Sequence, residues 1–171
     1  FFPKHAVSAA WGIHGRVLPL GNYFTEIGGR QVNRKTGLIR AQHLVAGYDW
    51  LPGNTLRIHV EAYRQTFDEV PVAKNAGSSW SIMNSIDGYS KYEMENTGEG
   101  ENTGLDLIVE KSFSGGLFFI LGGSVSRSRY TDAGGREHPT AFDSGLSATF
   151  TGGKEWTFEN ASVFQLGLKA L

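Results

Sequence analysis

Apolar and polar residues alternate with a period of two along most of this sequence. In residues 55–63, the apolar positions Leu56, Ile58 and Val60 are each followed by a polar residue. Successive side chains of a β-strand point to opposite faces of a sheet, so this order predicts a strand with one apolar and one polar face. The alternation recurs in 7–13, 43–50, 105–110, 117–130, 145–151 and 164–170. The chain is therefore expected to be all-β, with about seven strands and no amphipathic helix.

The predicted connections differ in length in a regular way. Long polar segments cover 17–40 and 68–101, whereas short turns are expected at Pro52-Gly53 and Ser114-Gly115-Gly116. A medium loop at 131–141 and a turn at 152–161 follow. Outer-membrane barrels have long loops at one end and short turns at the other. The pattern predicts an antiparallel up-and-down meander that is a segment of a transmembrane β-barrel, with residues 1–171 as a single all-β unit.

An odd number of strands does not close a bacterial up-and-down barrel, whose strand count is even. An open sheet leaves two unpaired edges, which are unfavourable in lipid and prone to association in water. We therefore expect the chain to be part of a larger barrel. Two alternatives stay open: a small complete eight-stranded outer-membrane barrel, and a soluble β-sandwich or barrel that binds carbohydrate.

Composition narrows the function classes. The chain has 171 residues, with 16 Lys plus Arg against 17 Asp plus Glu, a net charge of -1 and no Cys. Near-neutral charge gives no global basic field, so we expect no nucleic-acid partner. The lack of Cys excludes disulfides, thiolate zinc sites and iron–sulfur clusters within this chain. Its 23 Gly and 12 % aromatic residues fit a β-structure with many turns.

No catalytic motif is present in the sequence. It contains no H-E-x-x-H, G-x-S-x-G or phosphate-binding loop, and we expect neither an enzyme nor a cofactor or metal site. Gly152-Gly153-Lys154 is expected to form a turn. The acidic stretch 91–101 is expected to be an exposed loop and not a cation site.

Three groups of residues are candidates for contacts. The polar strand faces of a barrel point into the lumen, where the candidates are Arg57, His59, Glu61, Asp106 and Glu110. Aromatic and arginine side chains in long loops can hold a ligand, and the loop candidates are Tyr23, Arg30, Trp80 and Tyr89. Aromatic girdles mark the membrane interface, and the candidates near or within the short turns are Trp50, Phe113 and Trp156. Solvated strand faces and packing within loops are the simpler alternatives.

A series of short segments occurs in a fixed order along nearly the whole chain. They are Leu18-Pro19-Leu20-Gly21-Asn22-Tyr23-Phe24, Val45-Ala46-Gly47-Tyr48-Asp49, Val60-Glu61-Ala62-Tyr63, Val70-Pro71-Val72, 81–89, 102–111, Thr140-Ala141-Phe142-Asp143 and Gly152-Gly153-Lys154-Glu155-Trp156. Together they resemble the β-barrel of TonB-dependent outer-membrane receptors, in a lineage that often carries a carboxypeptidase-regulatory-like domain.

This resemblance implies a C-terminal barrel segment, about a third of a plugged barrel of about 22 strands. The 171 residues contain neither the plug domain nor the TonB box. The implied function is uptake of a large nutrient across the outer membrane of a Gram-negative bacterium. The implied partners are outer-membrane lipid, the plug domain and TonB in the full-length protein, and an unidentified nutrient ligand.

Overall fold

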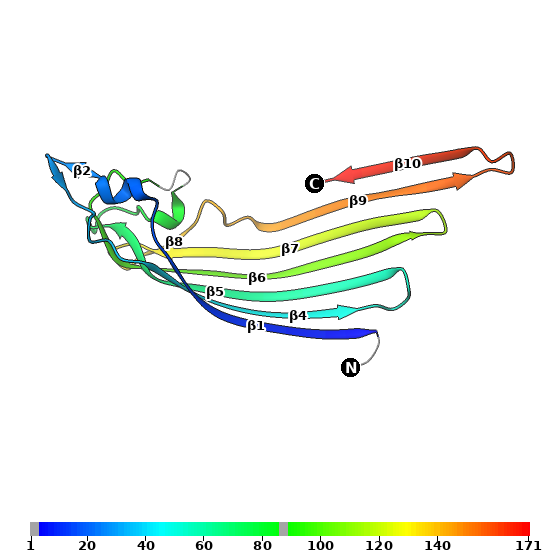
Figure 1. Cartoon of the computed structure of the whole chain (residues 1–171), viewed down its shortest axis with the longest axis horizontal. Coiled ribbons are helices and arrows are strands. Elements are labelled where there is room, and N and C mark those ends of the chain that lie inside the picture. Colours follow the sequence, from blue (N-terminus) through cyan, green and yellow to red (C-terminus); the bar gives the residue numbers. More distant parts are fainter. Residues whose placement is uncertain (1–3, 86–88) are drawn as a thin grey trace.

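The computed structural model describes residues 4–85 and 89–171 of the chain. Its long strands form one antiparallel sheet in which each strand pairs with the next along the chain (Figure 1). In order they are β1 (His5–Arg16), β4 (Ile39–Trp50), β5 (Leu56–Ala73), β6 (Met94–Ser114), β7 (Leu117–Thr131), β9 (Gly145–Thr157) and β10 (Val163–Ala170). The predicted all-β, up-and-down architecture is confirmed.

The long connections gather at one end of the sheet and the short turns at the other (Figure 1). The smaller elements lie in the long connections: η1 (Leu20–Phe24), β2 (Glu26–Ile27), β3 (Arg30–Gln31), η2 (Ile82–Asn84) and β8 (Glu137–Pro139). β2 pairs with β3, and β8 pairs with the end of β7. None of the described helices is long and apolar enough to span a membrane.

Two predicted loops are shorter than the sequence suggested. The loop expected at 68–101 shrinks to 74–93, because β5 continues to Ala73 and β6 begins at Met94. The acidic stretch 91–101 is therefore mostly strand and not loop. β5 and β6 remain paired in this region, although their register shifts after Phe67. Backbone pairing continues there even though apolar and polar residues no longer alternate in the sequence.

The turn expected at 152–161 also begins later, after Thr157, and Gly152-Gly153-Lys154 lies within β9. A Cβ atom added to Gly152 would lie 2.8 Å from the Cβ of Phe119. One added to Gly153 would lie 2.8 Å from the ring of Phe118. These glycines therefore permit close packing against β7 and do not form a turn.

Strand register divides the sheet into an apolar face and a polar face. Directly opposed residues share a face, and the central rows of the apolar face contain Ala46, Tyr48, Val60, Ala62, Leu105, Leu107, Val125, Leu146 and Ala148. On β6 this band lies between Lys111 and Thr103. The eight residues from Thr103 to Lys111 span about 26 Å along the strand. At the usual barrel tilt of about 40° it covers about 20 Å in height, close to the apolar band of membrane barrels.

The sheet is open at both edges. β1 pairs with β4 and β10 pairs with β9, and within the described residues no pairing joins β1 to β10. The apolar face is uncovered, with Leu44 55 %, Leu105 50 % and Val125 58 % exposed. The buried apolar cluster lies instead at the loop end, where Leu18, Val70, Ile82 and Met94 pack together.

Candidate functional site

A charged cluster lies on the polar face near the short turns. Asp49 accepts a hydrogen bond from Nε of Arg57 at 2.7 Å and forms an ion pair with Nη2 of the same side chain at 2.6 Å. It also lies 3.1 Å from Nδ1 of His59. Nε2 of His59 lies 3.8 Å from Glu61. These four residues, Asp49, Arg57, His59 and Glu61, are referred to as the charged cluster. All four come from the β4–β5 hairpin.

Register places all five predicted lumen residues on this face. Arg57 is directly opposite Glu110, and Glu61 is opposite Asp106. Asp106 accepts a hydrogen bond from Ser124 at 2.5 Å. Asp49, the central acceptor, was not among the residues predicted from the sequence. It lies opposite His59 in the hairpin, and counting outward from the Pro52-Gly53 turn would have found it.

Nearer the loops, the polar face is linked by side-chain hydrogen bonds across three strands. Asn102 on β6 donates to Gln65 on β5 at 3.2 Å, and Ser128 on β7 donates to Asn102 at 2.6 Å. Thr140 extends the chain by donating to Ser128 at 2.8 Å. Small and polar side chains thus cover this face, which suits contact with water or with another polar surface.

The first long connection is bound to the second by two buried asparagines. Asn22 accepts a hydrogen bond from the amide of Ser90 at 2.8 Å. Asn33 donates to the carbonyl of Tyr92 and accepts from the amide of Met94, both at 2.9 Å. We refer to the described parts of 17–38, 74–93 and 132–144 as the loop unit. These bonds make the first two of its connections one folded body.

The third connection is organised around Asp132, whose side chain has no exposed surface. Its carboxylate accepts hydrogen bonds from the amides of Gly134 (2.9 Å) and Arg136 (3.0 Å), from Nε of Arg136 (3.0 Å) and from Nε2 of His138 (2.8 Å). These bonds hold the pKa of Asp132 far below its ordinary value, and the bond from His138 has the largest effect. Burial of the carboxylate acts in the opposite direction and raises the pKa.

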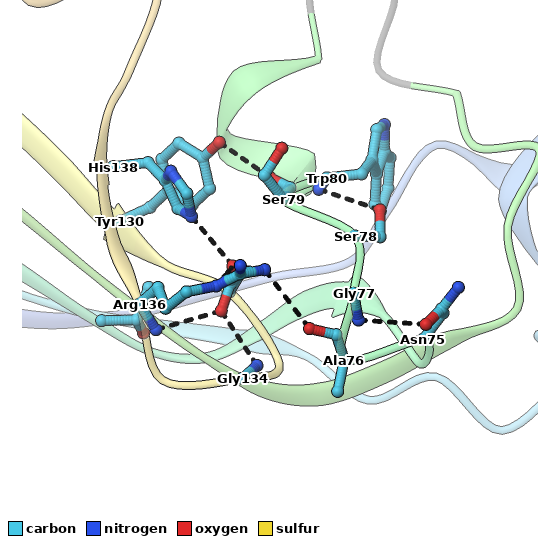
Figure 2. Close-up of polar contacts among 12 residues, drawn as sticks. Asn75, Ala76, Gly77, Ser78, Ser79, Trp80, Tyr130, Gly134, Arg136 and His138 are labelled. Carbon is cyan, nitrogen blue, oxygen red and sulfur yellow. Dashed lines mark hydrogen bonds and ion pairs between the residues drawn. The ribbon is translucent and has the colours of Figure 1, made fainter.

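Arg136 of this third connection and Tyr130 at the end of β7 both bind the second connection (Figure 2). Nη2 of Arg136 donates to the carbonyl of Ala76 at 3.3 Å, and the hydroxyl of Tyr130 donates to the carbonyl of Ser79 at 2.8 Å. The loop unit is therefore cross-linked by polar contacts throughout.

Replacing Asp132 by Asn should loosen this region, because an amide removes the charge that its donors share. Amide hydrogen exchange in 74–80 and 132–139 of the full-length protein should become roughly tenfold faster at pH 7. A depressed native pKa contributes stability that is present above the ordinary value of 3.8 and is lost as the pH falls below it. The variant should therefore lose this acid dependence. The control Glu137→Gln removes a surface ion pair with Arg127 and should change exchange little; equal effects would contradict the prediction.

The loop candidates divide into packed and exposed residues. Tyr23 packs against the buried apolar cluster, and its hydroxyl accepts a 3.4 Å hydrogen bond from the Leu18 amide. Trp80 packs there too, with its ring centroid 5.5 Å from that of Tyr92. Arg30 is exposed on the β2–β3 hairpin, and Tyr89 is 60 % exposed. Arg30 and Tyr89 stay candidates for ligand contact, whereas Tyr23 and Trp80 have a packing role.

The predicted interface aromatics all lie at the short-turn end. Trp50 is the last residue of β4 and lies opposite Ile58 on the apolar face. Trp156 lies within β9 and not in the turn, with its ring 5.6 Å from that of Phe164 on β10. Phe113 near the end of β6 is 55 % exposed. An aromatic girdle of a membrane barrel would require this placement, and the interface role of the three residues stays a prediction.

A cavity of about 620 Å³ lies where the polar face meets the loop unit. Strand residues of its lining include His14, Arg16 and His43, and the rings of the two histidines are 4.8 Å apart. None of these three was a candidate in the sequence, since they are far apart in it and share no motif. In the part of the chain that the structure describes, no group of three or more His, Asp or Glu residues is placed to hold a metal ion.

Neither a protein-family model nor a curated protein sequence matches this chain. Among solved structures, the FrpB iron transporter from Neisseria meningitidis (F3-3 variant) is similar, with a TM-score of 0.55 and 19 % sequence identity. The similarity covers 92 % of this chain and 22 % of the transporter chain. The chain thus spans about a fifth of the transporter's length, and the two are similar in fold over that stretch.

Proposed function

We propose that this chain is part of the barrel of a TonB-dependent outer-membrane receptor that takes up a large nutrient. In this proposal the apolar face contacts lipid, the polar face lines the lumen, and the loop unit lies on the outer side. The observation that carries the proposal is an uncovered apolar band opposite a hydrogen-bonded polar face, in a sheet with two open edges. The structural similarity to an iron transporter supports it.

A soluble module fits these observations less well. Soluble monomers rarely expose a contiguous apolar patch larger than a few hundred Å², and a β-sandwich covers its apolar face with a second sheet. In the described residues no second sheet covers the band that contains Leu105, Leu107 and Val125. A small closed barrel would require β1 to pair with β10, and the described register does not pair them.

The two ends of the polar face have different roles in this proposal. The charged cluster, with Asp106 and Glu110 beside it, is available to the plug domain of the full-length protein. The loop unit supplies the outer surface at which a nutrient is captured. TonB then drives uptake, and no covalent step or resident cofactor is part of the mechanism.

Spin labels on adjacent residues of β7 test the assignment of faces. These 171 residues contain no Cys, so Val125→Cys and Ser126→Cys each give one label site in the segment of the full-length protein in outer-membrane vesicles. Val125 belongs to the apolar face and Ser126 to the polar face. The label at 125 should be relaxed mainly by oxygen, and the label at 126 mainly by a water-soluble nickel chelate. Equal access of the chelate to both labels would favour a soluble module.

Transport needs a separate test. A strain with this gene deleted should lose growth on one or more scarce nutrients, and a strain lacking TonB should show the same loss. Restoration of growth by the full-length gene in cells without TonB would contradict the TonB-dependent mechanism while leaving the barrel intact.

A further inference from the structure

The cavity of about 620 Å³ is bounded by two parts of the molecule. Residues of the polar face on β1, β4 and β5 line it on the sheet side, and η2 with residues of the first and third connections lines it on the loop side. Its size is within the range of about 300–1,000 Å³ that small-molecule sites occupy. It is therefore large enough for a compact organic molecule.

The polar groups of this cavity favour negative charge. Arg16 contributes hydrogen-bond donors and no acceptor, and its guanidinium forms no ion pair with any residue that the structure describes. The rings of His14 and His43 each offer at least one N–H donor in either protonation state. Among the described lining residues, none is acidic.

The remaining walls favour a flat apolar body. Phe67 rises from β5, with its ring in edge contact with that of His43 at 6.4 Å. Ile82 of η2 belongs to the buried apolar cluster, and Phe67 and Met83 pack against it. Ile82 and Met83 also line the cavity, and Phe142 of the third connection adds another ring. A planar ring system can pack against these apolar side chains, while its charged group reaches the arginine.

We propose that this cavity binds an organic anion with a flat apolar body, held by Arg16 and the two histidines. The inference rests on the proposed function. It names the chemical class of the nutrient, or of one part of a larger nutrient, that binds at the loop end of the sheet. A second hollow of about 370 Å³ is also lined by arginines, including Arg64 and Arg127. There the arginines are paired with Glu101 and Glu137 at 2.6 and 3.1 Å, so an added anion gains less.

The test uses 2-naphthalenesulfonate and the neutral 2-naphthalenesulfonamide as probes, which share one ring system and differ in charge. Binding to the full-length protein in nanodiscs is measured by calorimetry, with empty nanodiscs as the blank. The sulfonate should bind about tenfold or more tightly than the sulfonamide, and Arg16→Gln should remove that advantage. Phe67→Ala should weaken both probes.

Arg40→Gln is the matched control. Arg40 neighbours Arg16 across β1 and β4 but lies one position along, on the opposite face, and pairs with Glu69 at 3.5 Å. It should leave both affinities unchanged. Equal affinity for the two probes, no effect of Arg16→Gln, or no binding above empty nanodiscs would each overturn the inference. The spin-label test decides the barrel separately, so a lipid-facing label at 125 with no bound probe refutes the ligand class alone.

Discussion

Replacing Leu107 by Arg is expected to lower the free energy of unfolding of the full-length protein in phospholipid vesicles by about 2–4 kcal/mol. Leu107 lies in the middle row of the apolar face, directly opposite Val60 on β5. It is four residues from Lys111 and four from Thr103, the polar limits of the band on β6. An arginine side chain near the middle of the apolar band has its charge in the hydrocarbon of the bilayer. It reaches water only if the side chain bends toward the interface or the bilayer thins locally.

The adjacent residue on the same strand supplies the control. Ile108 faces the other side of the sheet, opposite His59, and its exposure of 38 % is nearly that of Leu107, 39 %. Arginine at 108 enters the polar lumen, so we expect a loss below about 1 kcal/mol. Because Leu107 and Ile108 are almost equally exposed in this chain, a large difference between the two losses of stability would come from what each face contacts in the full-length protein. Equal losses, or a larger loss at 108, would show that lipid does not contact the apolar face.

The period-two pattern was enough to predict both faces of the sheet. Alternation assigns each residue to a face, and a short turn then fixes which residues are opposed, as for Asp49 and His59. This is why Arg57, Glu61 and their partners on β6 could be placed on one surface from the sequence. The roles proposed for them stay predictions.

Strand ends were harder to predict, because β5 and β6 extend past the apolar band. There both faces of β6 are polar, as in the stretch 95–103, and hydropathy cannot separate such a strand from a loop. The register also shifts between Phe67 and Val70, and Glu69 has a φ of 56°. A register shift of this kind moves the following side chains to the other face, so alternation no longer predicts which face a residue occupies.

The loop cavity could not be predicted for a different reason. Its shape depends on contacts between residues far apart in the chain, such as Asn22 with Ser90 and Asn33 with Met94. An asparagine in a polar segment gives no sign that it will be buried. Aromatic residues are equally ambiguous: Trp80 is part of the packing, whereas Tyr89 is exposed.

The second large effect is expected at Leu18, in the first connection. Leu18 is 3 % exposed and packs with Val70, Ile82 and Met94, which belong to β5, η2 and β6. Leu18→Ala removes most of that contact and leaves a cavity, at a cost of about 2–5 kcal/mol. The loss should appear as local opening of the loop unit and not as unfolding of the barrel. Hydrogen exchange at the amide of Ser90, which is bonded to Asn22, should therefore accelerate.

Leu20→Ala separates packing from any other effect of shortening a leucine in this segment. Leu20 lies two residues further on, in η1, and is 75 % exposed. Its truncation should change local stability by less than about 0.5 kcal/mol. If exchange at Ser90 accelerated equally in both variants, the first connection would depend on its backbone conformation and not on the buried cluster. If neither variant changed it, the hydrogen bonds of Asn22 and Asn33 would suffice to hold the connections together, and the apolar cluster would contribute little to the shape of the cavity.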